Sequence, residues 1–348
     1  MIQTSAPSAL RLLVIGAGPA ADALHLPVLA RLRDRGEVAL TLVCDLQHER
    51  AAAARGKFGF QEDSGAAVAA LERPDIDAVY IFGSAQLHYE YGRLALRNGK
   101  HLFVEKPVAP SFEQARELAE LAGAQGLIAA AGLNRRFLKS LAAVRACAGQ
   151  SGWRLAEAVF HKSEFANPAP FGARTWLGAN GIHGLDALIF MMGGLPEVLM
   201  AQAGESAAPQ PGAFSALMRW HDGAQGVFLC NNNAGTRREE YVFHAPDETY
   251  TVGAAGLTME RKGRPTTSMP LPMQGDGVAE EHEAFVRAIR SGLAPPHSIA
   301  AVAPSMFLAE LIESGFSGRV ELPKTELRAL PRWRCADRSI LVVQAAEL

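Results

Sequence analysis

A glycine-rich segment near the N-terminus contains the first residues whose spacing suggests chemistry. Gly16, Gly18 and Ala21 fit the pattern GxGxxA between an apolar run, Leu10–Ile15, and a helical pattern over Ala20–Arg35. The first glycine permits a tight turn, the second lets the backbone approach a pyrophosphate, and Ala21 lets the helix pack closely. The segment predicts a dinucleotide-binding loop, with a merely glycine-rich turn as the alternative.

Asp45 strengthens this prediction. It follows a second apolar run, Ala39–Cys44, about 24 residues after Ala21. An acidic side chain there accepts hydrogen bonds from both ribose hydroxyls of NAD and repels the 2′-phosphate of NADP. We therefore expect the chain to bind NAD in preference to NADP. The alternative is that Asp45 is a solvated strand end.

Lys106 follows another strand pattern, His101–Val104. Open α/β sheets present ligand-binding groups at such strand ends. An ammonium group next to a hydroxyl lowers its pKa or polarises the corresponding carbonyl. Lys106 is therefore a candidate catalytic residue, and the alternative is a solvated surface lysine.

His183 lies near the first turn of a predicted helix, Gly184–Met192. A helix N-terminus disfavours imidazolium, so His183 should be neutral and able to accept a proton near pH 7. That suits a general base for alcohol oxidation, or its conjugate acid for ketone reduction. Asp186, three residues on, shares the helical face and could orient the ring. The alternative is a histidine that caps a helix.

The elements that must position these residues alternate in type over the first third of the chain. Such alternation predicts right-handed βαβ units, hence a parallel sheet covered on both faces. The predicted strands are Leu10–Ile15, Ala39–Cys44, Ala78–Phe82, His101–Val104 and Leu127–Ala130. The predicted helices are Ala20–Arg35, Gln47–Phe58, Ala66–Leu71, His88–Asn98 and Ser111–Gln125.

The pattern changes beyond about residue 133. Alternating segments there predict antiparallel or mixed strands at Arg154–His161, Ala213–Trp220, Gly223–Asn231, Glu240–Phe243 and Glu248–Val252. Helices are predicted at Gly184–Met192, Val278–Ser291 and Ala303–Gly315. We predict an α/β chain with a doubly wound, Rossmann-type NAD-binding domain over residues 1–132. An α+β domain over residues 133–348 would follow and bind substrate.

Composition excludes several classes of protein. The chain of 348 residues is 49% hydrophobic and has a formal net charge of −2, which gives no electrostatic footprint for nucleic acid or an anionic membrane. No apolar run approaches the roughly 18 residues of a membrane span. Met1–Leu10 lacks a basic segment, so we expect no secretory signal. Four scattered cysteines without a CxxC pair predict reduced thiols in the cytoplasm.

Other polar segments are weaker candidates. Glu280, Glu281, His282 and Glu283 begin a helix, which we expect them to cap, and HExxH is absent, so we expect no metal. His161, Glu164 and Asn167 lie where a strand leads into a loop that could face the pocket. We interpret the remaining isolated histidines as structural: His25, His101, His221 and His244.

Several segments resemble the Gfo/Idh/MocA family of oxidoreductases, named for glucose–fructose oxidoreductase and inositol dehydrogenase. The resemblance covers nearly the whole chain in order. Its most specific parts are GKHLFVEKP, within Ala95–Pro107, and GxHxxD, about 75 residues later within Gly181–Asp186. The other matching segments are Asp77–Ile81, His88 and Asn134–Phe137.

The resemblance implies further roles for single residues. It places Lys106 beside nicotinamide and the reacting hydroxyl, after the strand-end Glu105, and His88 in a loop near nicotinamide. Glu105 and His88 thus join the predicted cofactor site. By position alone, Arg136 after the last predicted strand of the first domain and Trp176 before His183 are candidate substrate residues, together with Asp186. Arg136 could instead be a surface arginine, and Trp176, which follows Arg174 toward His183, could be core.

One departure from the family pattern affects the expected chemistry. Many sugar-oxidising relatives have an aspartate four residues before the histidine, where this chain has Ala179. The neighbouring Asn180 is uncharged and out of register. The Lys106–His183 pair is retained while the aspartate is lost, which suggests an altered substrate or a reductase direction.

The resulting expectation is an NAD(H)-dependent oxidoreductase acting on a hydroxyl or carbonyl of a sugar, cyclitol or related small polar metabolite. One alternative is an enzyme that recycles bound NAD during elimination or epimerisation. Another is a dinucleotide-binding regulator without turnover. The resemblance also implies an open second sheet that forms a homodimer or homotetramer through apolar positions such as Val227, Leu229, Val242 and Phe243.

Overall fold

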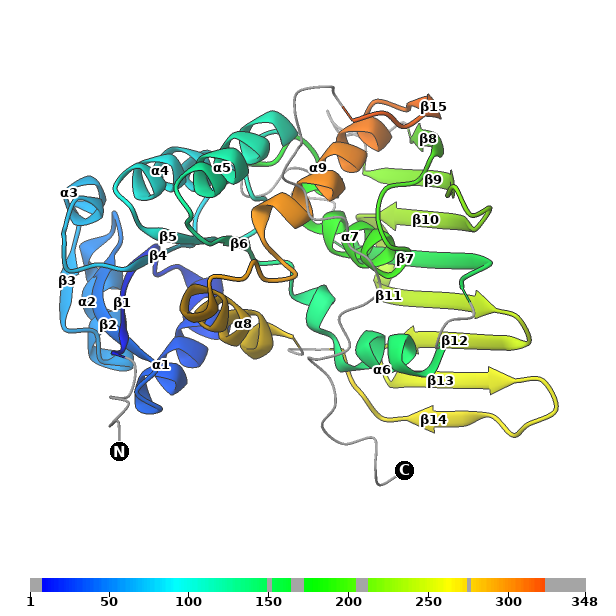
Figure 1. The fold of residues 1–348 in the computed structure, drawn as a ribbon, viewed down its shortest axis with the longest axis horizontal. Coiled ribbons are helices and arrows are strands. Elements are labelled where there is room, and N and C mark those ends of the chain that lie inside the picture. The colour runs from blue at the N-terminus through cyan, green and yellow to red at the C-terminus, as the bar shows by residue number, and fades with distance from the viewer. Residues whose placement is uncertain (1–7, 149–151, 164–171, 205–211, 274–276, 323–348) are drawn as a thin grey trace.

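The computed structural model of the chain describes residues 8–148, 152–163, 172–204, 212–273 and 277–322. These residues build two sheets with helices between them (Figure 1). The glycine-rich segment and Asp45 directly follow strands of the first sheet. His183 belongs to a helix that packs on the second sheet.

The first sheet is parallel, with the strand order β3-β2-β1-β4-β5-β6. This confirms the doubly wound prediction, and the order reverses between β1 and β4, where such sheets bind ligands. Its strands are β1 (Leu10–Ile15), β2 (Val38–Cys44), β3 (Glu62–Ser64), β4 (Ala78–Ile81), β5 (His101–Val104) and β6 (Ala129–Ala131). Strand β3 was not predicted, because its three residues, EDS, are all polar and form a short edge strand.

Helices cover both faces of the first sheet. They are α1 (Leu26–Asp34), α2 (His48–Phe58), α3 (Ala67–Leu71), α4 (Ala85–Arg97) and α5 (Phe112–Ala124). The predicted helix Ala20–Arg35 is not uniform, because it opens with a π-helical turn, Ala21–His25, before α1 begins. Ser111 caps α5 as its sequence suggests, since its hydroxyl accepts a hydrogen bond from the backbone N–H of Gln114.

The second sheet is mixed, with nine strands among the described residues in the order β14-β13-β12-β11-β7-β10-β9-β8-β15. Strands β7 and β10 are parallel, and the other neighbours are antiparallel. Predicted segments correspond to β7 (Leu155–Ser163), β9 (Ala213–Arg219), β10 (Gln225–Asn231), β11 (Asn233–Ala245) and β12 (Glu248–Gly253). The sequence analysis missed β8 (Val198–Ala203), β13 (Gly256–Arg261), β14 (Thr267–Met269) and β15 (Ser317–Arg319).

Helices cover the inner face of the second sheet. Helix α7 (Ile182–Met191) and helix α9 (Ile299–Glu313) were predicted within a few residues, whereas α6 (Lys139–Ala148) was not. They lie between the two sheets (Figure 1). The core is therefore continuous from the parallel sheet through α7 and α9 to the second sheet.

Helix α8 (Val278–Ser291) returns to the first domain after the second sheet is nearly complete. It packs beside α1 (Figure 1). The ring of Phe285 contacts the rings of Tyr80 on β4 and Phe103 on β5. Residues beyond 132 therefore complete the apolar core of the domain that contains the first sheet.

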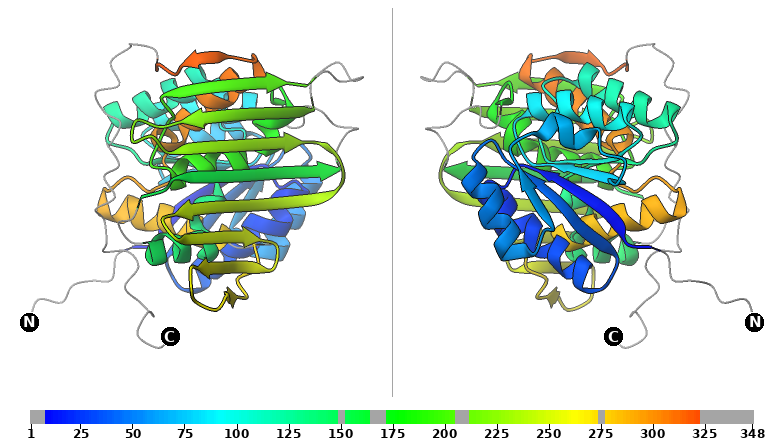
Figure 2. Two further views of the ribbon diagram at one scale, coloured as in Figure 1. Left: turned by 90° about the vertical axis from the view of Figure 1, so that its right-hand side faces the viewer. Right: turned by 90° about the vertical axis from the view of Figure 1, so that its left-hand side faces the viewer.

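No helix among the described residues covers the outer face of the second sheet (Figure 2). Met200, Leu217 and Leu229 are exposed on this face, with Met200 paired with Leu217 and Leu217 paired with Val227 across the strands. The expectation that Phe243 belongs to this face was wrong. Phe243 alternates inward with Tyr241 on β11 and is fully buried.

Among the described residues, no helix has the length and apolarity that a membrane crossing requires.

Candidate active site

The glycine loop has the geometry that close approach of a ligand requires. Gly16 has φ +97°, and a Cβ there would lie 2.0 Å from the carbonyl oxygen of Phe82, so only glycine fits. A Cβ on Gly18 would meet nothing within 4 Å, which leaves that side of the loop open. Ala21 is buried at the start of the π-helical turn. The loop can thus accept a diphosphate at a helix N-terminus.

Asp45 lies directly beside this loop. One carboxylate oxygen accepts the backbone N–H of Ala17 at 2.8 Å, and the other accepts that of Gln47 at 2.8 Å. These bonds fix the orientation of the side chain at the end of β2. Each oxygen keeps a second lone pair, so Asp45 can still accept hydrogen bonds from ribose hydroxyls.

Lys106 connects the first sheet to the segment before His183. Its ammonium Nζ donates to the carbonyl oxygen of Ala179 at 3.0 Å and to Oδ1 of Asn180 at 3.1 Å. Ala179 and Asn180 belong to a π-helical turn, Leu177–Gly181, that leads into α7. Two residues from distant parts of the sequence, Lys106 and His183, therefore border the same turn.

Glu105 contacts the backbone of Lys106. One oxygen accepts the backbone N–H of Lys106 at 2.9 Å, and the other lies 3.2 Å from Nε2 of His25. Burial alone would raise the pKa of Glu105, but the contact with His25 and the charge of Lys106 outweigh it, so the pKa is lowered. A Cβ on Gly132 would lie 2.3 Å from this carboxylate, so a larger residue there would displace the Glu105 side chain.

His88 lies within α4 and is fully buried, so the expectation that it belongs to a loop was wrong, whereas its place near nicotinamide stays a prediction. Its Nδ1 donates to the carbonyl oxygen of Pro107 at 2.6 Å, and its Nε2 accepts the backbone N–H of Gly83 at 3.1 Å. Burial lowers its pKa to about 4, so this neutral tautomer holds at neutral pH. His88 therefore positions the backbone next to Lys106.

His183 is the second residue of α7 and is buried. Its pKa lies well below the ordinary value, chiefly because of burial and then because of Arg135, Lys106, Lys162 and Arg237. The imidazole is therefore neutral, with burial rather than the helix terminus as the main cause. Its Nδ1 has no hydrogen-bond partner among the described residues.

Asp186 does not orient the ring of His183. Its carboxylate forms a bidentate ion pair with Arg136, with distances of 2.8 and 2.6 Å, and also accepts the hydroxyl of Ser305 at 2.5 Å. Arg136 further donates to the carbonyl oxygens of Pro296 and Ala301. Both side chains are almost fully buried, so their predicted roles in substrate binding are corrected to an internal tie between η2 (Asn134–Phe137), α7 and α9.

Trp176 is also a core residue. It is fully buried and packs against Phe160 of β7, so the prediction that it lines the substrate pocket was wrong. Arg174, two residues earlier, is largely exposed and pairs with Glu310 at 3.8 Å. It borders a small cavity of about 30 Å³ behind Lys106.

Lys162 and Asn180 are site residues that the sequence analysis missed. Nζ of Lys162 lies 3.4 Å from the same Asn180 Oδ1 that Lys106 contacts. Asn180 was considered out of register, but helical counting fails across a π-helical turn. A signal for Lys162 was available, because it lies two residues after the buried Phe160 and so shares its strand face.

A second group of charged residues, contributed by η2 and β11, lies near His183. Arg135 forms a bidentate ion pair with Glu239, with distances of 2.7 and 2.9 Å, and Arg237 contacts the same carboxylate at 3.0 Å. The hydroxyl of Tyr241 also donates to Glu239. The carboxylate of Glu239 therefore pairs with two guanidinium groups, which leaves a net positive charge. The surroundings of His183 thus favour a negatively charged group on a ligand.

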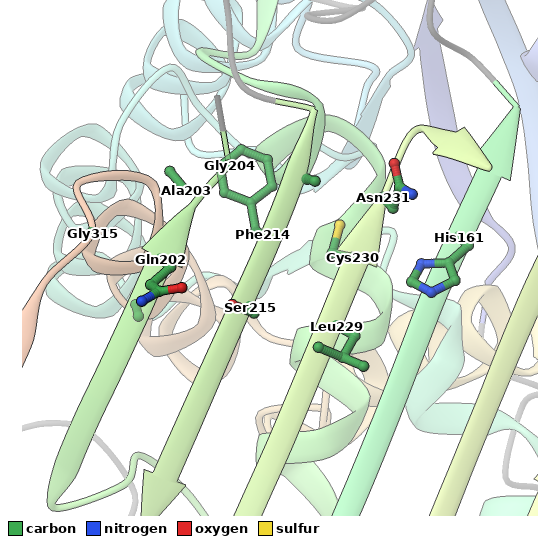
Figure 3. Close-up of a pocket in the computed structure, with 12 residues that line it drawn as sticks. His161, Gln202, Ala203, Gly204, Phe214, Ser215, Leu229, Cys230, Asn231 and Gly315 are labelled. Carbon is green, nitrogen blue, oxygen red and sulfur yellow. The ribbon is translucent and has the colours of Figure 1, made fainter. Parts of the chain in front are cut away.

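A hollow larger than the cavity bordered by Lys106 lies elsewhere among the described residues. It has a volume of about 540 Å³ at the ends of strands β7 to β10, and its lining includes His161, Gln202 and Asn231 (Figure 3). Neither Lys106 nor His183 borders it. His161 thus faces away from the predicted site, and Glu164 and Asn167 lie outside the described residues.

Two family models match the chain. The "Oxidoreductase family, NAD-binding Rossmann fold" matches residues 10–133, and the "GFO/IDH/MocA C-terminal domain" matches residues 139–252. Together they cover well over half of the sequence in the expected order. The chain belongs to the Gfo/Idh/MocA family of oxidoreductases.

Individual relatives support the same assignment. D-glucoside 3-dehydrogenase of Escherichia coli is 31% identical over 212 residues, which is 55% of each chain. The NAD⁺-dependent scyllo-inositol 2-dehydrogenase of Bacillus subtilis is 34% identical over 134 residues, 37% of this chain and 39% of that one. These matches span about half or less of the curated relatives. Levoglucosan dehydrogenase, solved with NADH and L-sorbose, shares the fold with a TM-score of 0.80 at 17% identity, covering 91% of this chain and 100% of that one.

Proposed function

We propose that the chain is an NAD(H)-dependent oxidoreductase that transfers a hydride between nicotinamide and a hydroxyl or carbonyl carbon of a sugar, cyclitol or related small polar metabolite. The observation that carries the proposal is the contact of Lys106 Nζ with the turn that leads to His183. This contact lies at the carboxyl edge of a sheet whose glycine loop fits a dinucleotide. The printed activities of the family relatives support the same reaction class.

The cofactor would be held by the loop containing Gly16, Gly18 and Ala21, with Asp45 accepting its ribose hydroxyls. The charge of Asp45 supports NAD over NADP, because a 2′-phosphate would be repelled. Bound there, NAD would supply a hydride acceptor at nicotinamide C4. The open side of Gly18 is the observation in the structure that supports this fit.

The chain's own residues would bind and deprotonate the substrate. The ammonium of Lys106 polarises the reacting oxygen, and the ionised Glu105 beneath it helps to keep that charge. Neutral His183 accepts the hydroxyl proton when the alcohol is oxidised. The cations around His183 stabilise negative charge that develops on the oxygen, so they assist the same step.

Screening sugars, cyclitols and keto acids for a change in NADH absorbance would test the proposal. With an active substrate, His183→Ala should lower kcat by roughly 10²–10⁴ while the Kd for NAD barely changes. Lys106→Ala should act similarly, and the double variant should lose much less than the product of the two effects. His221→Ala, an exposed histidine, is the matched control.

Other outcomes would favour the alternatives. Tightly retained NAD with substrate conversion but no net NADH would indicate elimination or epimerisation with internal recycling. NAD binding without any conversion would indicate a regulator. An unchanged kcat in His183→Ala would end the acid–base assignment.

A further inference from the structure

We propose that the chain contains a binding site for a divalent transition-metal ion at His25, Glu281 and His282. The three side chains are buried, and one ligand atom of each lies within 4.8 Å of the others. His25 ends the π-helical turn after the glycine loop, and Glu281 and His282 lie in the first turns of α8. The site would therefore join the two ends of the domain formed by β1–β6 and α8.

The distances between the ligand atoms are close to those of a metal centre. Nδ1 of His25 lies 3.0 Å from Nε2 of His282. Two nitrogens bound to one tetrahedral zinc ion, each at about 2.0–2.1 Å, lie about 3.3 Å apart. The imidazole nitrogens therefore need to separate only slightly to accept the ion.

The second nitrogen of His25 has the partner that metal-bound histidines usually have. Its Nε2 lies 3.2 Å from the carboxylate of Glu105. A carboxylate on the far side of an imidazole fixes the ring and raises its basicity as a ligand. Nδ1 of His25 is thus directed at His282 and Glu281 by a group that is not itself a ligand.

An unsatisfied carboxylate oxygen favours a metal ion over a closed hydrogen-bond network. Oε2 of Glu281 is buried and has no hydrogen-bond partner among the described residues. Buried polar atoms are normally paired, so a network without an ion should satisfy this oxygen. Two imidazoles and one carboxylate form the donor set that suits zinc and its neighbours in the first transition row.

The expectation that Glu280–Glu283 caps a helix was wrong, because the N-cap of α8 is Gly277 and no side chain caps it. Glu280 and Glu283 reach the surface and pair with Lys139 and Arg35, whereas Glu281 and His282 point into the protein. The sequence pattern concealed the site because its third ligand, His25, lies 257 residues before His282. A site of this kind would add a tie between α8 and the glycine-loop segment, in addition to the packing of Phe285.

Zinc itself is the probe for the test. The full chain, purified without a histidine tag, is stripped with a chelator, dialysed against Zn²⁺ and analysed by elemental mass spectrometry. We expect about one zinc ion per chain, with the bound amount reduced roughly tenfold or more in Glu281→Gln and His282→Gln. Glu280→Gln, next to the site on the same helix but paired at the surface, should bind zinc like the unmodified chain.

X-ray absorption at the zinc edge of the unmodified chain keeps the test decisive if a variant fails to fold. Nitrogen and oxygen ligands at about 2.0–2.1 Å would support the site. Sulfur ligands at about 2.3 Å would overturn it, because they would place zinc on cysteines. A chain that takes up no zinc would overturn it as well. Neither result bears on whether the chain binds NAD or oxidises a substrate.

Discussion

Nζ of Lys106 and Oδ1 of Asn180 are joined by a hydrogen bond of 3.1 Å between the first sheet and the turn before His183. The amide of Asn180 therefore occupies the position beside the lysine where a carboxylate would form an ion pair. An amide accepts the same hydrogen bond without adding a negative charge. The positive charge of Lys106 is therefore not neutralised by this partner and can polarise an oxygen atom of a ligand more strongly than it could beside a carboxylate.

Asn180→Asp tests this arrangement. The new carboxylate would face Lys106 and Lys162, so it should raise the pKa of His183 and lower the polarising effect of Lys106. We expect kcat/KM on the native substrate to fall by about tenfold or more and the acidic limb of its pH profile to move upward. Ala179→Asp is the comparison, because Ala179 is fully buried and an unpaired charge there should mainly destabilise the fold. An unchanged pH profile in Asn180→Asp would contradict the assignment.

Asp45→Asn tests cofactor preference. The amide keeps an acceptor for one of the two backbone N–H groups but removes the charge that repels a 2′-phosphate. The ratio of NADP affinity to NAD affinity should rise by about tenfold, which corresponds to about 1.4 kcal/mol. Titration of both cofactors by intrinsic fluorescence measures it. An unmodified chain that already binds NADP more tightly would refute the preference.

Asp186→Asn tests the buried ion pair with Arg136. The guanidinium would lose its charged partner while remaining buried, so the free energy of unfolding should fall by about 3–5 kcal/mol. Urea unfolding followed by circular dichroism measures this change. Glu113→Gln removes an exposed ion pair with Arg116 and should cost less than about 1 kcal/mol. Equal effects of the two substitutions would show that the buried pair is not a structural tie.

His297→Leu tests the pH dependence of stability. Both ring nitrogens of His297 are buried without a partner among the described residues, and burial lowers its pKa to about 3. The unfolded chain takes up this proton below about pH 6.5 and the folded chain does not, so stability falls as the pH drops from about 6.5 toward 3. The variant should lose less melting temperature between pH 7 and pH 5 than the unmodified chain. An identical pH dependence would contradict the role of His297.

Leu217→Glu tests assembly. We propose that the open face of the second sheet forms a homodimer or homotetramer, because Met200, Leu217 and Leu229 expose apolar surface there. Sedimentation at micromolar concentration should show an oligomer that the substitution dissociates. Leu293→Glu, at an exposed leucine outside the sheet, should leave it intact. A monomeric unmodified chain would rule the proposal out.

Local patterns in the sequence predicted those parts of the candidate site that are formed by residues close together in the sequence. The glycine loop and Asp45 needed only the alternation of strands and helices, because the turn and the strand end are encoded within a few residues. Lys106 and His183 stood out through family motifs at the ends of a strand and the start of a helix.

The remaining partners could not be predicted, because they depend on tertiary packing. Asp186 meets Arg136 from 50 residues away, and His25 meets His282 from 257 residues away. Asn180 could not be predicted for a local reason, since a π-helical turn departs from the spacing of an α-helix. Phe243 was assigned to the wrong face of the sheet because successive residues of a strand point to opposite faces. An error of one residue in the register therefore exchanges the buried and exposed positions.

The return of α8 to the first sheet also sets an order of events during synthesis. Strands β7 to β14 leave the ribosome before α8 does, so the nascent chain must expose the surface of Tyr80 and Phe103 while these strands form. The nucleotide-binding half therefore cannot finish folding first, although it is synthesised first. A chain interrupted before residue 278 would present this aromatic surface to solvent and to chaperones.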